Sequence, residues 1–136
     1  MAHDHPVSDG GNDRVQAFTD FRKRMNERIL AEDNQVVRRF FALDTQTYKP
    51  GALDVKTKEL LGLVASMVLR CDDCISYHVA QCKDAGLNRD ELFEAFSVAL
   101  VVGGSIVIPH LRRAVDFLDQ LEGSGVHAPA APSHEH

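Results

Sequence analysis

The chain has 136 residues and a mass of 15.1 kDa, which fits a single domain. Its residues are 44% hydrophobic and 26% charged, a balance that is ordinary for a globular protein and too apolar for a disordered one. Because 20 acidic residues outnumber 15 basic ones, the net charge is -5, which argues against nucleic acid or an anionic membrane as the main partner.

We expect a cytoplasmic protein, because the sequence shows no signal-peptide pattern, no membrane span and few cysteines. Residues 1–12 lack the apolar core of a signal peptide. The longest uncharged stretch, residues 95–111, is shorter than the roughly 20 residues that a membrane span needs. Three cysteines do not suit the disulfide framework of a small secreted protein.

Polar ends flank one predicted domain. Residues 1–12 are expected to form a flexible leader and residues 123–136 a flexible tail, because both are poor in bulky apolar side chains. Five of the seven histidines lie in these ends, where we expect solvated side chains rather than a metal site. The folded domain is therefore predicted to cover residues 13–122.

Apolar residues recur at steps of three or four along this domain, which is the helical period, and no convincing strand pattern is present. The pattern predicts an all-α, single-domain bundle of about six helices. The expected helices cover about residues 15–29, 36–41, 55–70, 72–86, 88–102 and 105–121.

Capping residues mark several of the expected helix ends. Asp54 stands where the third helix begins, and Asn88 with Glu91 matches a capping box at the start of the fifth. Gly86 is expected just past the end of the fourth helix, in the left-handed conformation that glycine adopts readily.

Residues 98–102 and 106–108 are apolar around the whole helix circumference rather than along one stripe. A helix of this kind has to be covered on all sides, and a small domain has few fully central positions. We therefore expect part of this surface to face another subunit, while a helix buried within one chain is the alternative.

The segment CDDCISYH, residues 71–78, carries the chemistry. Cys71 and Cys74 stand three residues apart where a turn enters a helix, so they can form a disulfide, and the helix N-terminus stabilises a thiolate. His78 follows one turn after Cys74 on the same face, so its imidazole can take the thiol proton. Cys71 precedes the helix and is expected to be the more exposed and mobile of the pair.

Other interpretations of this segment remain open from the residues alone. The pair could be half of a zinc site, but Cys71, Cys74, His78 and Cys82 all lie in one turn and one helix, which cannot surround an ion, so no metal site is expected. Alternatively, the pair could be small core residues beside a buried histidine. Cys82 lies in mid-helix without a helix-end field, and is expected in the core.

The run from residue 50 to residue 121 resembles the carboxymuconolactone decarboxylase superfamily, and specifically its alkylhydroperoxidase D-like branch. The shared pattern is a glutamate, a CxxC pair twelve positions later and a histidine four positions after the second cysteine, which here are Glu59, Cys71, Cys74 and His78. The runs PGALDVKTKELLGLVASMVLRCDDCISYH and VVGGSIVIPHLRRA also look like this family. The chain departs from the best-known alkylhydroperoxidase at Asp73, where that enzyme has a histidine.

This resemblance implies an all-α fold that assembles into trimers or hexamers, and a thiol peroxidase activity without a cofactor. Cys74 would attack the hydroperoxide, Cys71 would resolve the product, and His78 and Glu59 would relay protons. A thioredoxin-like or lipoyl protein would act as the reductant, and Cys71, as the sulfur expected to be more exposed, would meet it. The alternatives are a decarboxylase or lactone-processing relative that uses His78 and Glu59, or a non-enzymatic redox-responsive oligomer.

Two further side chains each have two interpretations in this pattern. Glu59 lies about 18 Å from the CxxC pair along a straight helix, so it can meet His78 only if the next helix folds back or another subunit intervenes. Otherwise it would be a solvated partner of neighbouring lysines. His110, near the start of the last helix, is a possible pocket member or a surface residue, and Arg112 and Arg113 are expected to pair with acidic helices.

Overall fold

The computed structural model describes residues 7–124 of the chain, with side chains from residue 14 to residue 123. This part of the chain is all-helical, with six α-helices, one short 3-10 helix and no strand, which confirms the predicted fold class. The elements are α1 (Val7–Leu30), α2 (Gln35–Thr47), α3 (Val55–Leu69), α4 (Asp72–Asp84), α5 (Arg89–Gly103), η1 (Ser105–Val107) and α6 (Ile108–Ser124).

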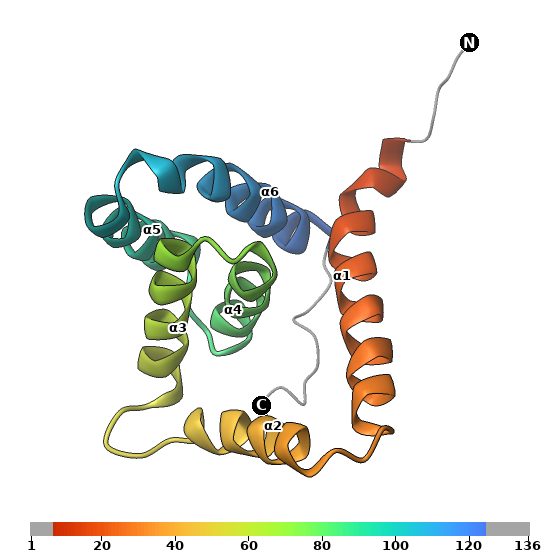
Figure 1. The fold of residues 1–136 in the computed structure, drawn as a ribbon. Helices are drawn as coiled ribbons and strands as arrows, with labels where there is room; N and C mark the ends of the chain where they lie inside the picture. Colours follow the sequence, from red (N-terminus) through yellow and green to blue (C-terminus); the bar gives the residue numbers. More distant parts are fainter. Residues whose placement is uncertain (1–6, 125–136) are drawn as a thin grey trace.

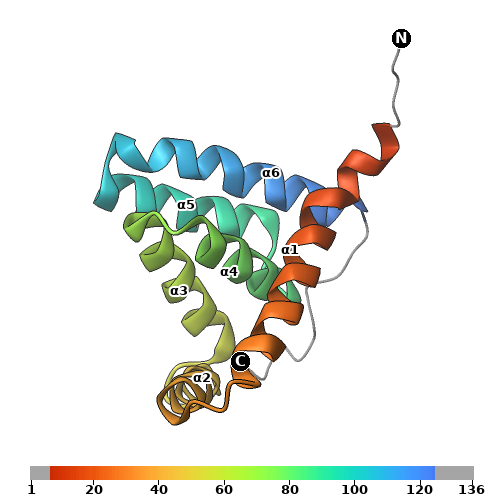
Figure 2. The ribbon, with the colours of Figure 1, turned by 45° about the vertical axis from the view of Figure 1, so that its right-hand side comes forward.

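Four of the helices gather around one core, α1 covers one side of it, and α2 lies outside it. Helix α3 packs against α4 and α5, while α4 and α1 both pack against α6. Figure 1 shows α3 to α6 clustered together, with α1 and α2 running along the outside, and Figure 2 shows the same arrangement from another side. We call α3–α6 the bundle and α1 with α2 the outer helices.

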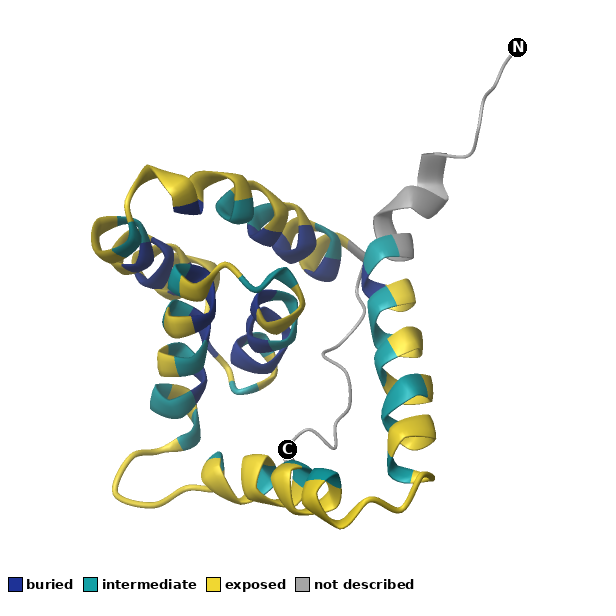
Figure 3. Ribbon diagram, viewed as in Figure 1, coloured by how far each residue is buried: buried dark blue, intermediate teal, exposed yellow. Residues whose placement is uncertain are grey.

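The core lies within the bundle, and α1 covers one side of it. Phe96 and Phe117 are among the largest fully buried side chains, and Phe18 of α1 meets Phe117 edge-on with ring centroids 5.6 Å apart. Helix α2, in contrast, has no buried residue. Figure 3 shows this contrast, with buried positions concentrated on the inner faces of the bundle and α2 mostly exposed.

Several predicted helix ends are confirmed by hydrogen bonds. The Asp54 side chain accepts a hydrogen bond from the Thr57 N–H at 2.8 Å, which starts α3. Asn88 and Glu91 form the expected capping box at the start of α5. Gly86 has a φ of 99°, so glycine occupies the left-handed position predicted after α4.

The first two helices are longer than predicted. Helix α1 begins at Val7, within the segment expected as a leader, and α2 extends to Thr47. The prediction rested on apolar periodicity, which does not mark helix turns that are polar or solvent-exposed. Residues 1–6 of the expected leader, residues 125–136 of the expected tail and the histidines in them lie outside the described residues.

A tight turn between α3 and α4 brings the two helices side by side. Arg70 takes the left-handed conformation, with φ 61°, and its N–H donates to the Met67 carbonyl. The Cys71 N–H then donates to the Ser66 carbonyl at 3.0 Å. The chain therefore reverses within two residues, and α4 returns along α3.

The apolar runs near the end of α5 and the start of α6 stay uncovered in the single chain. Val101 is 85% exposed, and Val102 and Ile106 are also exposed. Large apolar side chains are likewise exposed on α2, at Val36 and Phe40. No helix among the described residues combines the length and the apolar character that a membrane crossing requires.

Candidate active site

The two cysteines of the CxxC pair are joined at the start of α4. Cys71 is the N-cap residue, its sulfur accepts a hydrogen bond from the Cys74 N–H at 3.3 Å, and the pair forms a disulfide with Cα atoms 5.3 Å apart. Cys74 is exposed and Cys71 is only partly exposed. The expectation that Cys71 is the more exposed is therefore wrong, because its hydrogen bond to Ser66 draws it back against the end of α3.

A buried glutamate and a buried histidine form the polar centre of the site. Nδ1 of His78 on α4 lies 2.8 Å from Oε1 of Glu59 on α3. Glu59 is only 1% exposed, so it is not a solvated partner of the neighbouring lysines. The two side chains meet within one chain, because α4 folds back along α3. When Nδ1 donates to the carboxylate, the free lone pair of the neutral ring is on Nε2.

Nε2 of His78 faces a side chain that the sequence interpretation missed. The Tyr48 hydroxyl, just after α2, lies 3.5 Å from Nε2, and the two ring centroids are 5.5 Å apart. Burial, and then the charge of Glu59, raise the pKa of Tyr48 to about 12. The phenol is therefore protonated near neutral pH and able to donate a hydrogen bond.

A glycine on α3 provides the space in which these side chains meet. A Cβ atom at Gly62 would lie 2.6 Å from the Tyr48 hydroxyl oxygen and 2.6 Å from Cε1 of His78. Such distances are far below ordinary van der Waals contact. Gly62 therefore belongs to the site although it contributes no functional group, and a glycine inside an apolar helix pattern is the only sequence signal that could have indicated it.

Helix α1 also reaches the site. The Tyr77 ring lies beside His78, with centroids 5.4 Å apart, and the Arg22 guanidinium carbon is 3.8 Å from the centre of the Tyr77 ring. This is the geometry of a cation–π contact. Burial raises the pKa of Tyr77, and the charge of Glu59 acts in the same direction.

His78 forms its hydrogen bonds with side chains other than those of the two cysteines. Cys74 and His78 stand one turn apart on α4, as predicted, but in the part of the chain that the structure describes no hydrogen bond joins His78 to either sulfur. Its two ring nitrogens face Glu59 and Tyr48 instead. This is the arrangement of the disulfide form.

The third cysteine lies apart from the disulfide. Cys82 is free and fully buried, which confirms the prediction that it is a core residue. Burial raises the pKa of its thiol, and the negative charge of Glu59 adds to this effect. Cys82 is thus held as a neutral thiol near the Glu59–His78 pair.

His110 contacts the CxxC helix at a different point. Its Nδ1 lies 2.8 Å from Oδ1 of Asp72, and Nε of Arg113 donates to Oδ2 of the same carboxylate at 2.9 Å. His110 is therefore tied to the first turn of α4 and not to the Glu59–His78 pair. The expected pairing of Arg113 with an acidic helix is confirmed. Within the described residues no group of three or more His, Cys, Asp or Glu side chains is placed to hold a metal ion.

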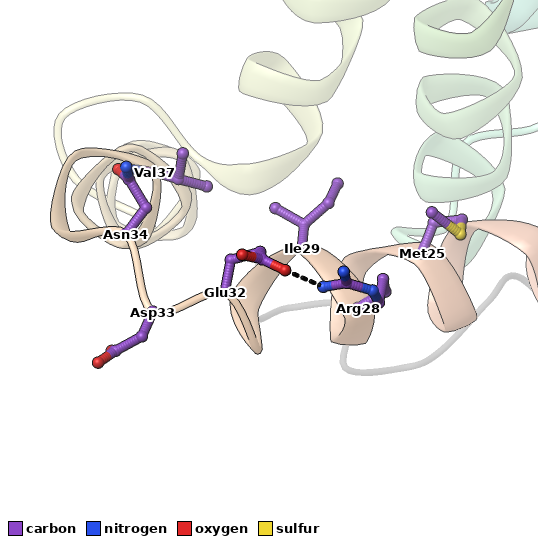
Figure 4. Close-up of a pocket in the computed structure, with 7 residues that line it drawn as sticks. All are labelled: Met25, Arg28, Ile29, Glu32, Asp33, Asn34 and Val37. Atoms are coloured by element: carbon purple, nitrogen blue, oxygen red, sulfur yellow. Dashed lines mark hydrogen bonds and ion pairs between the residues drawn. The ribbon is translucent and has the colours of Figure 1, made fainter.

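An open hollow lies at the corner between α1 and α2 (Figure 4). It has a volume of about 710 Å³, and an ion pair between Arg28 and Glu32, with an N···O distance of 2.7 Å, crosses one side of it. None of the residues that line it belongs to the disulfide or to the Glu59–His78 pair. The reactive groups and this hollow are thus separate features.

Comparisons with known proteins find a family model and relatives that match the part of the chain containing the site. A sequence model described as "Carboxymuconolactone decarboxylase family" matches residues 34–117, which include Tyr48, Glu59, His78 and both disulfide cysteines. A protein of Paracoccus denitrificans named "Uncharacterized protein 4 in cox locus" is 31% identical over 85 residues, which span 62% of this chain and 77% of that protein.

Solved structures of similar proteins share the fold. The chain is 56% identical to TM1620 from Thermotoga maritima, with a TM-score of 0.78 over 81% of this chain and 96% of that one. A second crystal structure of TM1620, with 53% identity over 84% of this chain and 99% of that one and a TM-score of 0.77, presents it as a carboxymuconolactone decarboxylase family protein for which a role in antioxidative response has been suggested. The Legionella pneumophila family protein lpg0406 is 28% identical, with a TM-score of 0.69 over 82% of this chain and 96% of that one.

Proposed function

This chain belongs to the carboxymuconolactone decarboxylase family, and on that premise we propose that it is a thiol-dependent peroxidase that reduces hydroperoxides. The observation that carries the proposal is the Cys71–Cys74 disulfide at the start of α4, one helical turn from a histidine paired with a buried glutamate. A reversible dithiol, a helix N-terminus and a nearby base are what a peroxide-reducing thiol requires.

In the proposed cycle, Cys74 is the thiol that attacks. Its sulfur bonds to one oxygen of ROOH as the O–O bond breaks, which gives a sulfenic acid on Cys74 and the alcohol ROH. The Cys71 thiol then displaces water from the sulfenic acid and forms the disulfide. The exposure of Cys74 in the structure supports this assignment, because the attacking sulfur has to meet the peroxide.

The Glu59–His78 pair supplies the proton transfer. His78 takes the thiol proton, which favours the thiolate, and the proton later protonates the leaving oxygen. Glu59 accepts the Nδ1–H bond, so it sets the tautomer and stabilises the imidazolium that forms. A carboxylate in this position orients the base and does not itself contact the peroxide.

A dithiol partner has to restore the reduced enzyme, and we propose a thioredoxin-like or lipoyl protein in the cytoplasm. Its thiolate attacks one sulfur of the disulfide, a mixed disulfide forms, and the second partner thiol then releases the reduced protein. Because Cys74 is the exposed sulfur, we expect the mixed disulfide to form there. This revises the sequence-based expectation that Cys71 meets the reductant.

Peroxide treatment of three cysteine variants, read by mass spectrometry, tests the proposal. Cys74→Ser should not consume peroxide, and Cys71→Ser should consume one equivalent and stop as a sulfenic acid on Cys74. Cys82→Ser should turn over nearly as the parent does. A sulfenic acid on Cys71 in the Cys74→Ser protein would reverse the assignment, and a disulfide that includes Cys82 would contradict the cycle.

The same experiment separates the alternative functions. Loss of two thiols per chain within the turnover time supports the peroxidase. Thiols that stay inert to peroxide would favour a decarboxylase-like enzyme in which the Glu59–His78 pair performs acid–base chemistry. A disulfide that forms once without turnover and changes the assembly state would instead indicate a redox-responsive oligomer.

A further inference from the structure

The Nε2 side of His78 is not explained by the Glu59–His78 pair alone. Glu59 occupies Nδ1, so every proton that His78 exchanges with the thiol passes through Nε2. The group that faces Nε2 in the structure is the Tyr48 hydroxyl, at 3.5 Å. Tyr48 comes from the segment between α2 and α3, thirty positions earlier in the chain.

The backbone around Tyr48 is tied to the helix that carries Glu59. Nζ of Lys58 donates hydrogen bonds to the carbonyl oxygens of Thr47, at 2.8 Å, and Lys49, at 2.7 Å. These carbonyls flank Tyr48 on both sides, and Lys58 is the residue directly before Glu59. The phenol and the carboxylate are therefore positioned by the same turn of α3.

The opposite side of the contact is kept open by Gly62, one turn further along α3. Any larger residue there would overlap both the Tyr48 hydroxyl and the His78 ring. Helix α3 thus holds the backbone on either side of Tyr48, orients His78 through Glu59, and leaves the space in which the two rings meet. Lys58 and Glu59 stand four and three positions before Gly62, so residues of two successive turns of α3 act on the same contact.

Building on the proposed function, we infer that Tyr48 is a positioning residue of the proton path. While the ring is neutral, its hydroxyl donates to Nε2 of His78 and, with Glu59 on the other ring nitrogen, holds the imidazole in place. Because Nε2 has one lone pair, the hydroxyl turns away from it when Nε2 takes the Cys74 proton. A hydroxyl suits both states of the ring, because it donates to neutral Nε2 and turns to accept from Nε2–H once the ring is protonated. A phenylalanine at this position can do neither.

Loss of the hydroxyl should therefore make the thiolate harder to form. The imidazolium would keep Glu59 but lose its second partner in a buried site, which disfavours the charged ring and raises the pKa of the Cys74 thiol. We expect Tyr48→Phe to slow alkylation of reduced Cys74 by about tenfold near neutral pH, which corresponds to a rise of about one pKa unit. Peptide mass spectrometry of iodoacetamide-treated protein across pH reads Cys74 separately from the other thiols.

A second variant tests the same contact without changing the tyrosine. Lys58→Met removes both hydrogen bonds that flank Tyr48, and should slow Cys74 alkylation about two- to threefold with the same shift toward higher pH. Lys56→Met is the matched control, because Lys56 is an exposed lysine in the same first turn whose side chain lies near Gly86 instead. It should follow the parent curve. Circular dichroism checks that each variant keeps the parent helix content.

The outcomes distinguish this inference from the proposed peroxidase. Alkylation needs no peroxide, so a shifted pH profile in Tyr48→Phe supports the role of Tyr48 even if the parent protein fails to consume peroxide. A Tyr48→Phe profile that coincides with the parent profile, while His78→Ala shifts it, overturns the inference and leaves the peroxidase standing. A shift in Lys56→Met as large as in Lys58→Met would also overturn it.

Discussion

The bundle and the outer helices contribute to the same site but are stabilised in different ways. The bundle carries the disulfide and the Glu59–His78 pair, and it buries its own apolar side chains. The outer helices supply Arg22 from α1 and Tyr48 from just after α2. Helix α1 buries Val15 against the bundle, whereas α2 has no buried residue. The reactive groups and the Glu59 that orients His78 thus lie on the bundle, whereas Tyr48 and Arg22, which contact His78 and Tyr77, come from the outer part of the chain.

This difference should be largest in unfolding experiments on two phenylalanines. Phe117 is 0% exposed in the bundle and Phe40 is 67% exposed on α2. We expect Phe117→Ala to lower the free energy of unfolding by about 3–5 kcal/mol, because it leaves a cavity. Phe40→Ala should change it by less than about 0.5 kcal/mol in the single chain.

Urea unfolding followed by circular dichroism measures both values. If Phe40→Ala lowered the free energy of unfolding as much as Phe117→Ala, the contrast between these two residues in the single chain would fail. Such a result would mean that a second subunit buries Phe40. The dependence of the Phe40→Ala effect on protein concentration separates the two cases.

The next largest effect is expected at the polar centre of the bundle. His78→Ala should raise the pKa of the Cys74 thiol and lower its reactivity with peroxide by roughly the 100-fold that lost acid–base assistance costs. Glu59→Gln keeps the shape but removes the charge, so it should give a smaller loss in the same direction. Glu94→Gln, an exposed change of the same kind on α5, should behave as the parent.

Stopped-flow measurement of peroxide reactivity across pH gives these values. If the alkylation rate of the His78→Ala thiol follows the parent curve across pH, the helix N-terminus alone activates Cys74. In that case the Glu59–His78 pair does not supply the proton transfer proposed for the cycle, and the contact of Tyr48 with His78 does not act on Cys74.

Assembly is the third test, and it concerns the exposed apolar residues of both regions. The run that predicted a subunit contact includes Val101, which is 85% exposed in the single chain. We expect an oligomer, a trimer or hexamer by family resemblance, and Val101→Asp should weaken it. Light scattering at micromolar concentration measures the mass, and a parent mass near the 15.1 kDa of one chain would contradict the expectation.

The sequence predicted those features that depend on residues close together in the chain. Helix caps at Asp54 and Asn88 need only a partner three residues away, so the local pattern was sufficient. The CxxC pair and its histidine lie on one helix and were identified for the same reason. Glu59 was identified through family resemblance, because twelve residues of helix separate it from Cys71 and spacing alone left its place open.

What the sequence could not predict depends on the packing of distant segments. Tyr48 meets His78 where Lys58 bonds to the backbone on either side of it and Gly62 leaves room for the ring, and these contacts join segments far apart in the chain. Arg22 reaches Tyr77 only because α1 passes that side of the bundle. The relative exposure of Cys71 and Cys74 was predicted wrongly, because the hydrogen bond from the Cys71 N–H to the Ser66 carbonyl has no signature in the sequence.

A smaller effect is expected from the two tyrosines, which connect the regions. The chain has two tyrosines and no tryptophan, so its near-ultraviolet absorbance reports them directly. The pKa of Tyr48 is raised to about 12 and that of Tyr77 is raised as well, mainly by burial. A tyrosine is neutral when protonated, and its pKa in the unfolded chain is about 10. A raised pKa in the folded protein therefore contributes stability below about pH 10, and this contribution is lost as the pH rises through the folded-state pKa.

We therefore expect no tyrosinate absorbance near pH 10 in the folded protein, and a rise only at higher pH or on unfolding. Tyr48→Phe should remove one of the two steps. Tyrosinate formation by both residues close to pH 10 in the folded protein would show that the outer helices do not cover the site as described.

The smallest effect is expected at Asp72, where α6 meets the start of α4. Burial raises the pKa of this carboxyl, but the hydrogen bonds and charges of His110 and Arg113 outweigh burial and hold the pKa below its usual value. An acid with a lowered pKa contributes stability above its unfolded pKa, and the contribution is lost as the pH falls through the folded value. Because the Asp72 side chain is 44% exposed, we expect less than about 1 kcal/mol.

Asp72→Asn should therefore lower the free energy of unfolding slightly near neutral pH, and the difference from the parent should close below about pH 4. Asp73→Asn is the matched control, since it removes an acidic charge from the same helix turn at an exposed position. Any loss common to both variants measures the interaction of acidic side chains with the helix N-terminus, which is worth about 0.3–1 kcal/mol. The excess loss in Asp72→Asn measures the link to α6. Urea unfolding across pH gives both values, and equal losses in the two variants would mean that His110 and Arg113 add nothing to the position of the CxxC helix.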